Sequence, residues 1–181
     1  MAIADPQTAA KPPQATMVAI ARARDVPGAN DNLSACAALV AIAERLAAAP
    51  VAGLRVMLVS CGAEEVCQGG IYDFLADHRE QLPTATTSVL NLDTIGSPRL
   101  CMLEGEGALL MEDYPRRFRD LVADAAARAG VPLRRGMRAT SSTDATVVRR
   151  RGYPVTTLVS VTEAKTLANY HLLSDVSANV D

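Results

Sequence analysis

Histidine and the large aromatic residues are scarce in this 181-residue chain. It contains two histidines, no tryptophan and two phenylalanines, although 49% of its residues are hydrophobic. Without many aromatic rings, the hydrophobic core must be built from Ala, Val and Leu. The length suits one domain and is sufficient to bury a real core.

A strong net charge and long apolar runs are also missing. The formal net charge of −2 argues against a nucleic-acid-binding surface, so the arginine clusters at residues 134–135 and 149–151 are interpreted as solvated faces. No apolar run reaches the ~18 residues that a membrane-spanning helix needs. Residues 1–16 lack a basic head followed by an apolar stretch, which excludes a signal peptide and predicts a disordered lead-in. We therefore expect a cytoplasmic location by default, with no nucleic-acid or membrane partner.

The four cysteines follow no zinc-finger spacing. A buried, reduced thiol is the default expectation for each of them. Cys61 and Cys67 flank a pair of glutamates, so a local disulfide between them stays open as an alternative.

Strand-like and helix-like segments alternate along the chain. Short β-branched or apolar runs predict strands at residues 17–21, 54–60, 87–92, 100–103 and 155–161. Helical spacing predicts helices at residues 33–48, 71–80, 116–129 and 143–151. Asn30, Asp31 or Asn32 can supply the N-cap of the first helix, and Gly130 and Gly152 suit the ends of the last two. This alternation indicates an α/β sheet that is at least partly parallel, in one domain over residues 17–181.

Three acidic clusters and one late histidine follow the predicted strands. They are Asp31, the pair Glu64 and Glu65, Asp93, and His171. Active sites of open α/β sheets gather at the carboxyl ends of the strands, so these side chains are expected on one rim. Carboxylates and imidazole are the ligands of a hydrolytic zinc centre, and a glutamate beside the metal can act as a general base.

The residues around these clusters form motifs. Residues 28–32 read Gly-Ala-Asn-Asp-Asn, residues 64–65 are followed by Gln68-Gly69-Gly70, residues 92–96 read Leu-Asp-Thr-Ile-Gly, and His171 precedes Asp175. In this order they resemble the M28 family of zinc aminopeptidases, from about residue 27 to residue 181. The resemblance implies a three-layer sandwich whose mixed, mostly parallel sheet is flanked by helices. It also implies that the sheet is incomplete at its N-terminal edge.

The same resemblance implies a ligand set. Asp31 would be a bridging ligand, Glu65 and His171 would complete one zinc site with it, and Asp93 would serve a second metal. The family normally carries another histidine ligand ahead of the bridging aspartate, where this chain has Arg22 or Ala23. We therefore expect one zinc ion rather than two.

Two further residues take catalytic roles by the same resemblance. Glu64 would be the general base, which accepts a proton from the attacking water. Tyr170 resembles a tyrosine that, in some members, helps to hold the developing oxyanion. Each site residue also has an ordinary explanation: helix capping for Asp31, turn capping for Asp93, solvated loop acids for the glutamate pair, and packing for Tyr170 and His171.

The predicted function is that of a zinc-dependent metallopeptidase, an aminopeptidase that removes N-terminal residues from peptides. One alternative is an inactive remnant that binds ligands or partners without turnover. Another is a single-zinc acyl transferase of the glutaminyl cyclase kind. A missing sheet edge would also expose strand hydrogen-bonding groups and favour self-association.

Overall fold

Strand β5 is the centre of the sheet, because six of its seven residues, Val155–Val161, are buried. It pairs in parallel with β1 and antiparallel with β2. Strand β2 in turn pairs antiparallel with β3 and in parallel with β4. The computed structural model describes residues 25–181, and this part of the chain therefore contains a mixed sheet of five strands.

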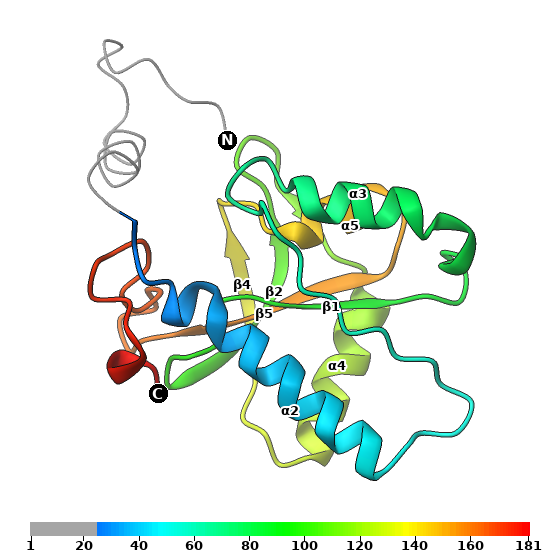
Figure 1. Cartoon of the computed structure of the whole chain (residues 1–181), viewed down its shortest axis with the longest axis horizontal. Coiled ribbons are helices and arrows are strands. Elements are labelled where there is room, and N and C mark those ends of the chain that lie inside the picture. Colours follow the sequence, from blue (N-terminus) through cyan, green and yellow to red (C-terminus); the bar gives the residue numbers. More distant parts are fainter. Residues whose placement is uncertain (1–24) are drawn as a thin grey trace.

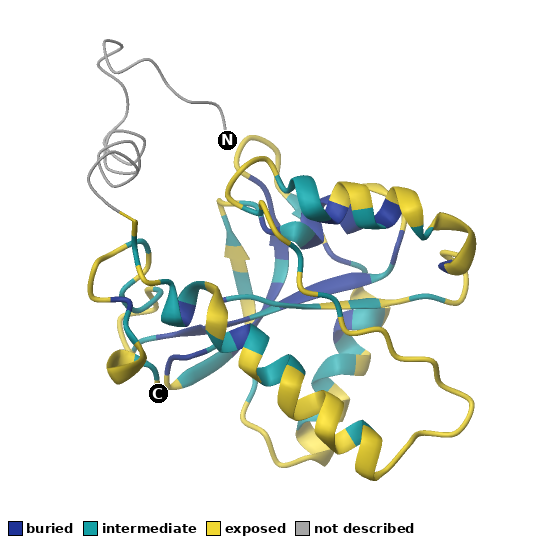
Figure 2. Cartoon of the chain, viewed as in Figure 1, coloured by how far each residue is buried: buried dark blue, intermediate teal, exposed yellow. Residues whose placement is uncertain are grey.

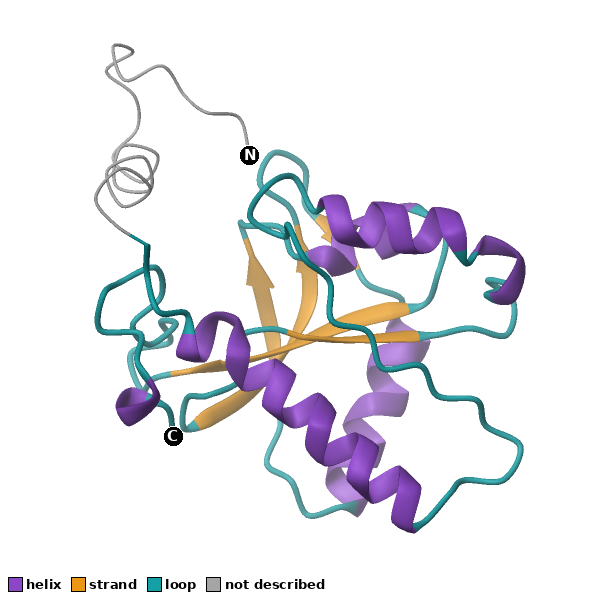
Figure 3. Cartoon of the chain, viewed as in Figure 1, coloured by secondary structure: helices purple, strands orange, loops and turns teal. Residues whose placement is uncertain are grey.

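Helices lie on both sides of this sheet (Figures 1 and 3). The other strands are β1 (Val89–Leu92), β2 (Arg99–Glu106), β3 (Glu112–Asp113) and β4 (Arg134–Ala139). The helices are α2 (Ser34–Ala48), α3 (Gly69–Asp77), α4 (Arg116–Arg128) and α5 (Asp144–Arg150), with short helical turns at Ala29–Leu33, Arg79–Gln81 and Ser177–Asn179. Helix α5 packs on β1 and β5 and contacts α3, whereas α4 packs on β2 and β5. Figure 1 shows α3 and α5 on one side and α2 and α4 on the other, which confirms the predicted three-layer α/β arrangement.

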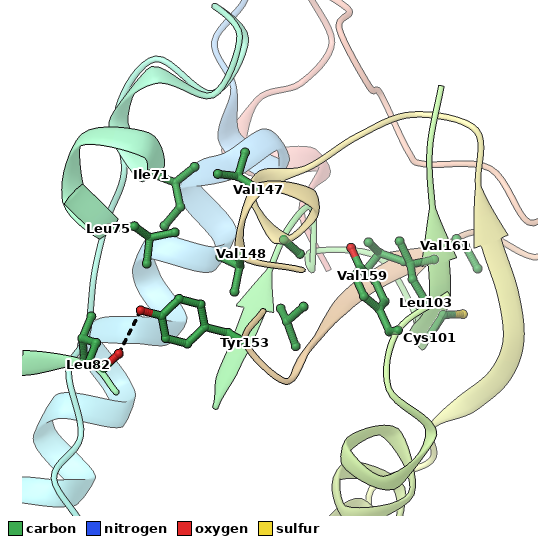
Figure 4. Packing of buried hydrophobic residues seen from close by; sticks show 13 residues of the cluster. Ile71, Leu75, Leu82, Cys101, Leu103, Val147, Val148, Tyr153, Val159 and Val161 are labelled. Carbon is green, nitrogen blue, oxygen red and sulfur yellow. Dashed lines mark hydrogen bonds between the residues drawn. The ribbon is translucent and has the colours of Figure 1, made fainter. Parts of the chain in front are cut away.

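The core is aliphatic, as the shortage of aromatic residues requires. Figure 4 shows Ile71 and Leu75 of α3 against Val147 and Val148 of α5. Burial of each such side chain stabilises the fold by about 1.5–3 kcal/mol. Figure 2 shows that the buried residues concentrate in the sheet and in the helix faces turned towards it.

Most of the predicted elements are confirmed. Strand β5 has the predicted bounds, and α2, α3, α4 and α5 each begin and end within a few residues of the predicted ones. Gly130 and Gly152 follow their helices with φ of 68° and 90°, the left-handed conformation that a glycine C-cap adopts at no steric cost. Cys36, Cys61 and Cys101 are free thiols, so the disulfide that was open for Cys61 is not formed. The expectation of a buried thiol holds for Cys101, whereas Cys36 and Cys61 are partly exposed and Cys67 is exposed.

The predicted strand at residues 54–60 is wrong for the described part of the chain. This segment forms no strand pairing there, and Leu54, Val56, Met57 and Leu58 are each more than a third exposed. A β-branched run indicates only that a segment fits a sheet, whereas a strand also needs a partner with free backbone groups.

Two strands and one helix cap also differ from the prediction. Strands β3 and β4 were not predicted, because their sequences are charged, and the predicted solvated arginines at 134–135 begin β4. Helix α2 has no side-chain cap, because Asn30, Asp31 and Asn32 are engaged elsewhere. The strand predicted at residues 17–21, the lead-in at residues 1–16 and the sheet edge expected there lie outside the described residues.

No helix in the described part is long and apolar enough to cross a membrane.

Candidate active site

Four separate loops bring the predicted site residues together. Asp31 lies in the turn before α2, the glutamate pair lies in the loop before α3, and Asp93 directly follows β1. His171 lies in the loop after β5. Asp31, Glu64, Asp93 and Tyr170 line one cavity of about 280 Å³.

His171 lies between two carboxylates. Its Nε2 atom is 3.2 Å from Oδ2 of Asp31 and 2.6 Å from Oε1 of Glu65. One donor atom from each of these three residues lies within 4.8 Å of the other two. Two carboxylates and one imidazole that converge in this way match the three protein ligands of a catalytic zinc site, which keeps its fourth position for water or substrate.

The histidine is held in this position electrostatically. Its hydrogen bonds with Asp31 and Glu65, together with their negative charge, raise the pKa of His171 to about 10. The hydrogen bond with His171 lowers the pKa of Glu65. A cation bound among the three residues would replace the imidazolium proton.

Asp175 fixes the backbone that carries Asp31. Its two carboxylate oxygens accept hydrogen bonds from the backbone N–H groups of Asn30 and Asp31, at 2.7 and 3.1 Å. Asp175 itself is only 1% exposed. The sequence motif placed this aspartate after the histidine, but only the structure shows that it supports Asp31, which is distant in the sequence.

Hydrogen bonds join the segment around Asp93 to the turn that carries Asp31. The side chain of Asn32 accepts from the backbone N–H of Thr94 at 3.0 Å and donates to the carbonyl of Leu92 at 3.2 Å. The Asn30 side chain accepts from the backbone N–H of Gly96 at 2.7 Å, and a Cβ at Gly96 would lie 2.9 Å from that same oxygen. This close approach explains why the Leu-Asp-Thr-Ile-Gly motif ends in glycine.

The loop with the glutamate pair is closed by a second glycine of the motif. The backbone N–H of Gly70 donates to the carbonyl of Gly62 at 3.1 Å, and a Cβ at Gly70 would lie 2.3 Å from that oxygen. The loop therefore folds back onto the first turn of α3. Gln68 attaches the same loop to the start of α5, because its Nε2 donates to the carbonyl of Thr143 at 2.8 Å.

Glu64 lies among other acids. Burial, together with the charges of Glu65, Asp93, Asp144 and Asp31, raises its pKa to about 8. Acidic groups held this close repel one another when ionised, and a bound cation would relieve the repulsion. The carboxylates present therefore fit a cationic metal.

Asp93 and Asp144 share this environment without joining the three-residue group. Burial raises the pKa of Asp93 to about 6, and Thr94 donates to its Oδ1 at 2.7 Å. Burial and the charge of Asp93 raise the pKa of Asp144 to about 6. Asp144 is the first residue of α5, and its charge also acts on Glu64. The positions of Arg22 and Ala23, where a further ligand was expected, lie outside the described residues.

Tyr170 stacks on the histidine ring, with ring centroids 3.9 Å apart and an interplanar angle of 19°. Burial and the charges of Asp31, Glu65 and Asp93 raise the pKa of its phenol far above the ordinary value. The hydroxyl therefore keeps its proton and can act as a hydrogen-bond donor in the cavity.

The fold and the site define a hydrolase type, in which an α/β sheet presents histidine and carboxylate donors beside a half-buried glutamate. The family model for peptidase family M28 matches residues 13–181. The chain therefore belongs to the M28 peptidases, a family that is generally zinc-dependent, and is a peptidase at the level of its family. A search of curated proteins found no match.

Proposed function

We propose that this chain is an aminopeptidase that uses one zinc ion held by Asp31, Glu65 and His171. The observation that carries the proposal is the convergence of three donor atoms from three separate loops within 4.8 Å. Glu64, with its raised pKa, lines the cavity next to them. Bound zinc would polarise the scissile carbonyl and lower the pKa of water in the site.

The residues of the chain supply the proton transfers. Glu64 accepts a proton from the attacking water and delivers it to the leaving amine. Partial burial and the neighbouring acids raise the pKa of Glu64 to about 8, which suits a group that must both accept and donate a proton. Tyr170 donates its phenolic hydrogen to the substrate oxygen as negative charge develops there.

Negative charge in the cavity supports removal of residues from the amino end. Asp31, Glu64 and Asp93 line the space that a substrate enters. These carboxylates attract the α-ammonium group of a free N-terminus and repel the carboxylate of a C-terminus. A free amino terminus is therefore the preferred substrate group.

Metal content and product analysis test the proposal together. Purified protein, freed of loosely bound metal, should contain about one zinc per chain by elemental analysis and should hydrolyse fluorogenic aminoacyl amides. Chelation should abolish the activity, zinc should restore it, and N-acetylated substrates should be resistant. Folded protein without zinc would contradict the proposal and favour the inactive binding protein. Cyclisation of N-terminal glutamine without release of residues would favour the acyl transferase.

The apparent zinc affinity is expected to rise with pH from 6 to 8.5, by about tenfold per pH unit for each displaced proton. His171 has a pKa of about 10 in the metal-free protein, so zinc must displace its proton throughout this range. A competition titration against a chelator, corrected for the protonation of the chelator, measures the slope. An affinity that levels off above pH 7, as an unperturbed histidine would give, contradicts the pairing of His171 with the two carboxylates.

A further inference from the structure

A buried acid, Glu106 at the end of β2, lines the same cavity but takes no part in the three-residue group. It is 1% exposed. Its Oε2 atom accepts hydrogen bonds from the hydroxyls of Tyr114 and Thr143, the latter at 2.8 Å. Its Oε1 atom is closed to solvent and has no hydrogen-bond partner among the described residues. A buried carboxylate oxygen without a donor is unfavourable, so a ligand that donates a hydrogen bond to this atom would be stabilised.

The partners of Glu106 hold its carboxylate in one orientation. The Thr143 hydroxyl accepts from Nδ2 of Asn91 at 3.1 Å and from the backbone N–H of Ala145 at 3.3 Å, which leaves its own proton for Glu106. Tyr114 is buried, with 2% of its surface exposed. One oxygen is therefore occupied twice while the other remains an unused acceptor.

One part of the cavity wall is apolar and comes from Leu103, Met137, Val159, Val161 and Leu167. Figure 4 shows Leu103, Val159 and Val161 grouped between β2 and β5. The segment 140–143 adds hydroxyl groups to another part of the wall. An alkyl chain fits the apolar part, because the side chains there carry no hydrogen-bonding group.

Two basic side chains, Arg138 and Lys165, also line the cavity, and both residues are exposed. Arg138 donates from Nε to Oδ1 of Asp113 at 2.9 Å, so its charge is already paired. Neither cation is hydrogen-bonded to Oε1 of Glu106. The buried carboxylate therefore remains available to a cation that enters with the substrate.

We propose that this cavity receives the side chain of the N-terminal residue of the substrate and selects an alkyl stem that ends in a cation, as in lysine, with Glu106 as the specificity-determining residue. This inference rests on the proposed aminopeptidase function. The alkyl stem contacts the apolar walls, and the terminal ammonium donates to the unused oxygen of Glu106. An acidic side chain is excluded by repulsion, and an uncharged one leaves the buried oxygen unpaired.

Binding of three small amides separates the two amino groups of such a substrate. Lysinamide carries both the α-amine and the terminal amine, norleucinamide carries only the α-amine, and 6-aminohexanamide carries only the terminal amine. Calorimetric titration of the zinc-loaded protein and of the chelated protein should show lysinamide binding at least about tenfold more tightly than norleucinamide. Equal or tighter binding of norleucinamide would overturn the proposal, and this comparison needs no variant.

Glu106→Gln keeps the shape of the side chain and removes its charge. The substitution should weaken the binding of lysinamide and of 6-aminohexanamide by about tenfold and leave the affinity for norleucinamide unchanged. Glu112→Gln is the matched control, because Glu112 pairs with Glu106 in the β2–β3 register, lies outside the cavity lining and is bonded to Arg150. It should bind all three amides as the wild type does. If Glu106→Gln weakened all three equally, Glu106 would be a structural residue and the proposal would fall.

Turnover distinguishes failure of this inference from failure of the proposed function. The zinc-loaded wild type should cleave a lysyl amide with a lower KM than the norleucyl amide, and Glu106→Gln should remove that difference. Cleavage of both amides with equal KM would overturn the inference and leave the aminopeptidase intact. If neither amide were cleaved, the proposed function would fail, and the binding comparison would still decide whether the cavity selects a cation.

Discussion

Replacement of Glu64 by glutamine is expected to lower kcat by about a thousandfold while zinc stays bound, because a positioned general base contributes roughly 10²–10⁴ in rate. The amide cannot accept the proton from water, but Glu64 is outside the group of three convergent donors. Zinc content by elemental analysis and kcat on an aminoacyl amide measure the two effects separately. Glu65→Gln should instead lose the metal, since Glu65 supplies one of the donors. Equal loss of metal in both variants would contradict this division of roles.

Two control experiments test whether the loss of activity in Glu64→Gln is caused by a loss of folded structure. Glu44→Gln removes a carboxylate from an exposed position of α2 and should leave kcat unchanged. The metal-free Glu64→Gln protein should be at least as stable as the wild type at pH 9, in urea unfolding. The reason is that the wild-type Glu64, with a pKa of about 8, is then ionised against neighbouring acids, whereas the amide carries no charge. A marked loss of stability would point to a structural role.

Replacement of His171 by asparagine is expected to lower zinc affinity by more than about a hundredfold and to abolish activity, because loss of a ligand costs more than the 10–100-fold typical of its supporting residues. His171 contributes the only nitrogen donor of the three-residue group. Chelator competition measures the affinity, and the rise in melting temperature on adding zinc should disappear with it.

The second histidine of the chain provides the matched control. His78 follows α3, where its ring stacks on Phe74 at a centroid distance of 4.4 Å. His78→Asn should therefore bind zinc as the wild type does. Wild-type zinc affinity in His171→Asn, or loss of zinc in His78→Asn alone, would rule out the ligand set of the proposal.

Part of the candidate site was predictable because two of its residues follow strands. Asp93 follows β1 and His171 lies in the loop after β5, and residues after the strands of an α/β sheet meet at one edge. Glu64 follows residues 54–60, which form no strand in the described part of the chain, so this argument does not explain its position. The glycines of the motifs also indicate tertiary contacts, because each stands where a Cβ would collide with another part of the chain. Gly70 and Gly96 lie where another part of the backbone or a buried amide comes too close for a Cβ. The glycine at position 96 thus reflects a contact with Asn30, which is distant in the sequence.

The supporting residues were less visible in the sequence. Asp175 supports Asp31 through backbone hydrogen bonds that no periodicity encodes. Glu106 is one of two acids in β2, with Glu104, and nothing in the neighbouring sequence shows that its carboxylate lines the cavity. The strand predicted at residues 54–60 was wrong for another reason. An apolar run favours a strand but does not show whether a neighbouring strand is available to pair with it.

The sequence alone determined the α/β class, the order of most helices and strands, the aliphatic core and the family. These follow from local composition and from motifs whose residue types are constrained by close backbone contacts. Only the tertiary structure decided that His171 is shared between Asp31 and Glu65, that the charge of Asp144 acts on Glu64, and that Glu106 retains an unpaired oxygen. The pKa and the hydrogen bonds of each group depend on its burial and its neighbours, which a linear chain does not specify until it folds.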